Sequence, residues 1–150
     1  YEKRPIKMKA KDKELYEALF KDLSPVEYLK VTKIAKWKKF KSGSQIIKEG
    51  ADVKRLILIY NGTVDVAVKA AKVAELRDGQ FVGEMSFLTE RPATATCIAK
   101  HDCECLVWSQ PEFKSLLKRN PSLYFSIQSL LSAQVSDALI NTSKKSNSTS

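Results

Sequence analysis

The most informative part of the sequence is the segment FVGEMSFL, residues 81–88. It is followed by PATA at residues 92–95. Gly83 has no Cβ, so the main chain can approach another group closely at this point. A short helix that begins near Glu84 would start with free backbone N–H groups and the positive end of its dipole. Such a helix start is suited to an anion such as a phosphate. Residues 81–95 therefore predict a small cup lined by backbone amides.

Short β-rich runs separated by turn signals surround this segment. The candidate strands are residues 37–40, 45–48, 55–60, 63–68, 72–76, 94–99 and 103–109. Leu56–Tyr60 is apolar throughout and should lie deep, whereas Thr63–Val68 alternates and should bury one face. Asn61-Gly62 between these two runs predicts a hairpin. Many short strands at this spacing indicate a barrel or a sandwich.

Helical periodicity precedes the strands, over residues 12–36. Leu15, Leu19 and Phe20 share one stripe of the first helix. Ser24-Pro25 then supplies an N-cap and a proline at the first position of a second helix. A helical segment therefore leads into the β-rich region.

Helical periodicity returns after Ser109, and Pro111 and Pro121 each start a helix. The second of these helices carries a long apolar stripe, formed by Leu123, Ile127, Leu130, Leu131, Val135 and Leu139. The polar residues 142–150 have nothing to pack and are expected to form a disordered tail.

The chain has only five glycines, and all of them fall at predicted strand junctions. They are Gly43, Gly50, Gly62, Gly79 and Gly83. Their order, together with the segment 81–88, resembles the cyclic nucleotide-binding domain family over roughly residues 15–140. The resemblance implies a mainly β fold, an antiparallel β-roll of the jelly-roll type, with N-terminal helices, an internal cassette helix and two C-terminal helices. The expected parts of this single domain are 1–36 (helical), 37–109 (β-roll, with the cassette at 81–95), 110–141 (C-terminal helices) and 142–150 (tail).

The resemblance also implies how the cassette works. The backbone of Gly83, Glu84, Met85 and Ser86 would meet the ligand, and Glu84 would accept a hydrogen bond from a ribose hydroxyl. Met85, Phe87 and Leu88 would hold the short helix against the barrel wall. The predicted ligands are cAMP or cGMP.

The chain departs from the family pattern after the short helix. The family has Pro-Arg-Ala-Ala, and its arginine pairs with the cyclic phosphate, whereas this chain has Pro92-Ala93-Thr94-Ala95. Loss of one charge-assisted contact costs roughly 1.5–3 kcal/mol, which weakens affinity about 10- to 150-fold.

Two nearby residues bear on this loss. Arg91 lies two positions before Ala93 and would have to swing in past a proline. Thr94 follows the vacant position, and in some family members a threonine there contacts a guanine base. Alternatively, Thr94 is simply a β-branched strand residue.

Composition limits the function classes. With 43% hydrophobic and 29% charged residues in 150, the chain reads as one globular domain. Of the net charge of +9, +7 lies in residues 1–41, which indicates either a surface for anionic lipid or nucleic acid or a set of solvated helical faces. No zinc-finger or other base-reading motif accompanies that segment. Cys97, Cys103 and Cys105 contain no Cys-x-x-Cys pair, so reduced structural thiols are expected and no metal.

The sequence predicts no enzyme and no cofactor. Ser86 lies in Gly-Glu-Met-Ser-Phe, not in the Gly-x-Ser-x-Gly of a nucleophile elbow, and no Walker or zinc motif is present. The lone His101 is expected in a turn, without a catalytic partner.

The resemblance implies a regulatory domain that senses a cyclic nucleotide or a related anionic small molecule and moves its C-terminal helices. The alternative is a degenerate member that binds no cyclic nucleotide and acts as a protein-interaction or oligomerisation module, such as a homodimer. Because the chain begins with Tyr1, an effector domain or membrane segment is expected outside it. The expected location is the cytoplasm or the cytoplasmic face of a membrane. A DNA-reading module, found in some relatives, is absent here, so no nucleic-acid partner is expected for this fragment.

Overall fold

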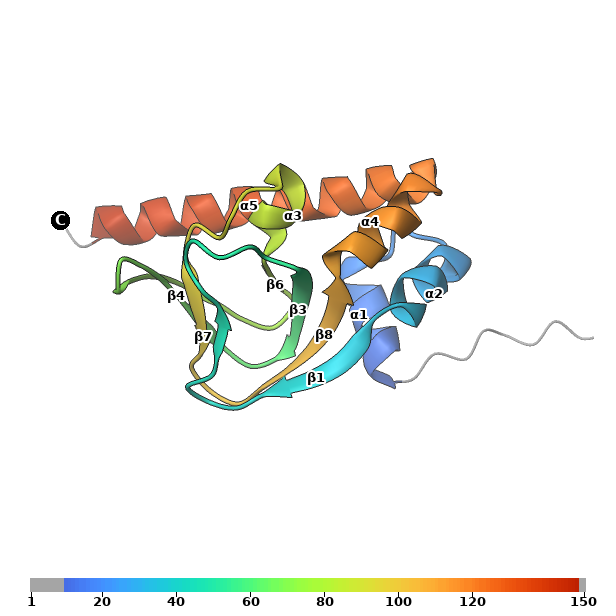
Figure 1. Cartoon of the computed structure of the whole chain (residues 1–150). Coiled ribbons are helices and arrows are strands. Elements are labelled where there is room, and N and C mark those ends of the chain that lie inside the picture. The colour runs from blue at the N-terminus through green and yellow to red at the C-terminus, as the bar shows by residue number, and fades with distance from the viewer. Residues whose placement is uncertain (1–9, 149–150) are drawn as a thin grey trace, which may run out of the picture.

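The computed structural model describes the backbone of residues 10–148 and the side chains of residues 10–134 (Figure 1). Its helices are α1 (Ala10–Leu19), α2 (Pro25–Lys33), α3 (Glu84–Thr89), α4 (Gln110–Lys118) and α5 (Pro121–Ser148). Its strands are β1 (Lys36–Phe40), β2 (Gln45–Ile47), β3 (Arg55–Asn61), β4 (Val64–Val68), β5 (Ala71–Leu76), β6 (Phe81–Val82), β7 (Thr96–Ala99) and β8 (Cys103–Ser109). The short helix α3 interrupts the strands between β6 and β7, as the cassette pattern predicts.

The strands form two four-stranded sheets in which every pairing is antiparallel. One sheet has the order β1-β8-β3-β6 and the other β2-β7-β4-β5. Figure 1 shows the two sheets rolled around a common interior, with the helices gathered on one side and above. The predicted β-roll with flanking helices is confirmed.

The central run of strand β3, Leu56–Ile59, is apolar because both of its faces are covered. Ile57 and Ile59 belong to the core between the two sheets. Leu56 and Leu58 point to the other face and pack in the core under the helices. All four are fully buried, so the expectation that this run lies deep is confirmed.

The hairpin predicted at Asn61-Gly62 is wrong. β3 pairs with β6 and β8, whereas β4 pairs with β5 and β7, so the chain crosses here from one sheet to the other. Gly62 is needed because a Cβ on it would lie 2.8 Å from the Cα of Cys103. The hairpin between β4 and β5 closes instead at Lys69 and Ala70, whose φ angles of 51° and 66° are those of a type I′ turn.

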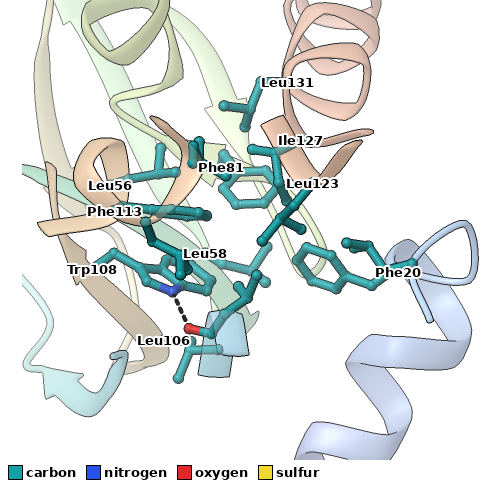
Figure 2. Packing of buried hydrophobic residues seen from close by; sticks show 14 of the residues in the cluster. Phe20, Leu56, Leu58, Phe81, Leu106, Trp108, Phe113, Leu123, Ile127 and Leu131 are labelled. Atoms are coloured by element: carbon teal, nitrogen blue, oxygen red, sulfur yellow. Dashed lines mark hydrogen bonds between the residues drawn. The ribbon is translucent and has the colours of Figure 1, made fainter. Parts of the chain in front are cut away.

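The core under the helices joins α1, α2, α4 and α5 to the β1-β8-β3-β6 sheet (Figure 2). At its centre, the indole Nε1–H of Trp108 donates to the Val31 carbonyl oxygen at 2.9 Å. The Trp108 and Phe113 rings lie 5.3 Å apart. Ser24 and Glu27 cap the start of α2 reciprocally, as Ser24-Pro25 predicts for a helix start.

Helix α5 is docked on this core. Leu123, Ile127 and Leu131, from the predicted apolar stripe, are at most 2% exposed, and Leu130 packs beside them. The side chains of Val135 and Leu139 lie outside the described residues. The part of the stripe before residue 135 therefore belongs to the hydrophobic core in this structure.

Helix α5 continues through Ser148, beyond residue 141, where the sequence analysis ends it. Residues 142–148 contain no glycine or proline, and each residue added to an existing helix forms a further backbone hydrogen bond. Among the described helices, none combines the length and apolar character that a membrane span requires.

Candidate functional site

The cassette begins where β6 ends. Val82 pairs with Ile57 of β3, and Gly83 then turns the chain with a φ of +91° to become the N-cap of α3. A Cβ on Gly83 would lie 3.1 Å from the Arg55 carbonyl oxygen. Glycine is therefore required by both conformation and space, and α3 starts at Glu84 as predicted.

Helix α3 is held mainly from the side of the helices. The Phe87 ring lies 5.5 Å from that of Phe113 in α4, and Leu88 packs against the same core. The Lys114 Nζ lies 3.1 Å from the Glu90 carboxylate. Met85 does not contribute to this packing as predicted: it is 39% exposed, because its place in the helix turns it toward a pocket.

The segment after α3 is fixed by backbone pairing. The Ala93 N–H donates to the Ala51 carbonyl oxygen at 2.9 Å, and the Gly50 N–H donates to the Ala93 carbonyl oxygen at 2.8 Å. This pairing leaves the Ala93 side chain 8% exposed and facing the same pocket.

A pocket of about 240 Å³ lies between the cassette and the β2-β7-β4-β5 sheet. It brings together seven of the eight predicted site residues: Gly83, Glu84, Met85, Ser86, Ala93, Thr94 and Ala95. Arg91 is exposed and is not among the residues that line the pocket. The ligand-binding role of the seven residues that line the pocket stays a prediction.

The remaining wall of the pocket consists of aliphatic side chains and one thiol, and none of these residues was predicted as part of the site. These residues are Ile47, Val53, Val66, Val68, Val73, Ala74, Leu76 and Cys97. The alternation of Thr63–Val68 was a signal for Val66 and Val68, since residues two apart in a strand share a face. Nothing in the sequence indicated that this face lines a pocket.

Among residues 10–134, Glu84 is the one acidic residue that lines the pocket. Burial raises the pKa of its carboxyl to about 7, although its own backbone N–H, hydrogen-bonded to the carboxylate, acts in the opposite direction. Burial, and then the charge of Glu84, raise the pKa of the Cys97 thiol to about 12. Among the described residues around the pocket there is no lysine or arginine to compensate Glu84.

Helix α5 is hydrogen-bonded to the turn that precedes the cassette. The Gln134 Nε2 donates to the Gly79 carbonyl oxygen at 2.9 Å, and the Phe81 N–H donates to Gln134 Oε1 at 3.4 Å. Figure 1 shows α5 passing directly beside α3. The cassette and the last helix are therefore physically connected.

Of the remaining candidate residues, only Cys97 lines the pocket. Cys97, Cys103 and Cys105 are buried and free. Residues 10–134 contain no group of three His, Cys, Asp or Glu side chains arranged for a metal ion. His101 is exposed in the turn between β7 and β8.

The structure is a β-roll with an internal helix beside a pocket, and a long helix is hydrogen-bonded to the turn that precedes the internal helix. The model of the family "Cyclic nucleotide-binding domain" matches residues 37–120, more than half of the chain. The chain belongs to the cyclic nucleotide-binding domain family, whose members are regulatory and not catalytic.

Relatives and solved structures agree with this assignment. The human potassium/sodium hyperpolarization-activated cyclic nucleotide-gated channel 1 is 33% identical over 84 residues, which are 56% of this chain and 9% of the channel. A cyclic nucleotide-binding domain from Methylobacillus flagellatus shares the fold with a TM-score of 0.80 and 22% identity, over 93% of this chain and 85% of that one. The regulatory domain of Toxoplasma gondii PKA, solved with cAMP, has a TM-score of 0.71 and 22% identity, over 84% and 48% of the two chains.

Proposed function

We propose that this chain is a non-catalytic regulatory domain, in which a small ligand in the cassette pocket controls how α5 is docked. The observation that carries the proposal is the convergence of Gly83–Ser86 and Ala93–Ala95 on one pocket. The cyclic nucleotides cAMP and cGMP are the first ligands to consider, because the family and its cAMP-bound structural neighbours bind them.

The route from pocket to α5 runs through Gln134. Its side chain binds the backbone at Gly79 and Phe81, and Phe81 lies only two residues before Gly83. A ligand that shifts the cassette would change these two hydrogen bonds. Because α5 docks through only three buried side chains, those of Leu123, Ile127 and Leu131, among its described residues, a change at Gln134 can shift the helix between two arrangements.

A calorimetric titration of the chain with cAMP and with cGMP tests the proposal. We expect saturable, weak binding, with a Kd of about 100 µM or above for the anionic ligands, since the contact that arginine makes in the family is missing. Heats indistinguishable from dilution up to millimolar ligand, for both nucleotides and for uncharged analogues of them, would contradict it.

A second candidate function is a protein-interaction or oligomerisation module. It is favoured by two exposed aromatic side chains on α5, Phe125 at 72% and Tyr124 at 48%. Exposed aromatic residues are enriched at interfaces between proteins. Sedimentation of the ligand-free chain distinguishes the two candidates, because a stable dimer combined with no ligand binding would support the second.

A further inference from the structure

We propose that the cassette pocket selects an uncharged small molecule, with an apolar body and a hydrogen-bonding group that meets Glu84, over an anion of the same shape. This inference rests on the proposed function of the pocket and names the chemical class of its ligand. Three features carry it: the absence of a lysine or arginine among the described residues that line the pocket, the carboxyl group of Glu84 and the apolar wall.

Four cationic side chains from segments near the pocket are paired with carboxylates outside it. On β5, Val73, Ala74 and Leu76 line the pocket, whereas Lys72 and Glu75 pair with each other outside it. Arg77 and Lys100 also bind Glu75, with N···O distances of 3.1 and 2.8 Å. Lys114, near α3, is paired with Glu90. Lys72, Arg77, Lys100 and Lys114 are therefore engaged with carboxylates. No lysine or arginine among residues 10–134 lines the pocket.

Glu84 lies where an anion would meet the start of α3. The Glu84 carboxyl lines the pocket at the first residue of α3. A phosphate bound at this helix start would lie next to that carboxyl, and the two groups carry like charge when the carboxyl is ionised. Like charges that share a partly buried site repel each other strongly, because little solvent screens them. A hydroxyl or amide group on an uncharged ligand has no such conflict, since it can donate to the same carboxyl.

The wall of the pocket favours the same ligand class. Val53, Val66, Val68 and Leu76 offer methyl groups, and an anion moved from water into such surroundings loses hydration without gaining a partner. The volume of about 240 Å³ is just below the ~300–1,000 Å³ that is usual for ligand pockets, so the ligand should be small.

The test compares cAMP with its methyl phosphotriester, in which one methyl group removes the charge and leaves the remainder unchanged. At about pH 8, where the Glu84 carboxyl is ionised, we expect the uncharged ester to bind the chain at least tenfold more tightly than cAMP, despite its extra methyl group. Glu84→Gln should reduce the ratio of ester affinity to cAMP affinity, because it should improve the binding of cAMP. Glu90→Gln, a change of an exposed carboxylate on the same segment, is the matched control and should leave the ratio unchanged.

The possible results distinguish a failure of the proposed charge preference from a failure of the proposed ligand-binding function. Tighter binding of cAMP than of the ester would overturn the inference and leave the proposed function intact. Equal affinities would overturn it as well, because charge would then play no part. Binding of neither compound at millimolar concentration would overturn both. Circular dichroism of each variant shows whether a lost signal reflects unfolding.

Discussion

Ala93→Arg is expected to raise the affinity of the chain for cAMP at least tenfold. The pairing of Ala93 with Gly50 and Ala51 fixes the direction of its side chain, which enters the pocket. A guanidinium group there would compensate the charge of Glu84 and form charge-assisted hydrogen bonds with the cyclic phosphate. One such contact is worth roughly 1.5–3 kcal/mol, which corresponds to about a 10- to 150-fold change in Kd.

Calorimetry of the variant with cAMP and with its methyl ester measures the effect. The ester should gain less than cAMP, so the order of the two affinities should reverse. Ala93→Gln is the control for the volume and polarity of the new side chain, and it should leave cAMP affinity within a few-fold of the original. An Ala93→Arg chain that folds normally and binds cAMP no better would contradict the account, because lack of charge would then not be the reason for weak binding.

Glu84→Gln is expected to stabilise the fold, and more so in alkaline solution than in acid. The pKa of this carboxyl is raised from 4.5 to about 7, so the folded chain holds the proton more tightly than the unfolded chain. Below pH 4.5 both states are protonated and nothing is lost. As the pH rises from 4.5 through about 7, the unfolded state ionises freely while the folded state must ionise a buried group, so stability falls.

The expected gain from this substitution is up to about 3 kcal/mol at about pH 8 and about 1 kcal/mol or less near pH 5. Urea denaturation of the two chains at both pH values measures it. Glu17→Gln, which changes an exposed carboxylate on α1, is the control and should alter stability little at either pH. A Glu84→Gln chain no more stable than the parent at alkaline pH would show that the Glu84 carboxylate is well solvated.

The sequence predicts the cassette well because local chemistry dictates it. Gly83 is required by a positive φ and by the Arg55 carbonyl oxygen close by, and the residues after it form a helix start. The same local reasoning fails at Asn61-Gly62. A turn signal shows that the chain bends, but not which strand it meets next, and here the following strand belongs to the other sheet.

The properties of the site that depend on tertiary contacts could not be read from the sequence. Gln134 is an ordinary polar residue of a helix until α5 brings it to Gly79 and Phe81. Met85 has an apolar side chain of the kind found in protein cores, yet its position on α3 directs it toward the pocket. The burial of Glu84 likewise depends on walls contributed by distant strands. The proposed charge preference of the pocket and its proposed connection to α5 both rest on these features.

We propose that occupancy of the cassette pocket is transmitted to α5. An NMR titration of the ¹⁵N-labelled chain, with cAMP and with its methyl ester, tests it most directly. The account predicts shifts of the Gly83–Ser86 and Ala93–Ala95 amides, accompanied at the same ligand concentrations by shifts of the Phe81 amide and of the Gln134 side-chain amide. Shifts confined to other surfaces, or cassette shifts that leave Phe81 and Gln134 unchanged, would contradict it.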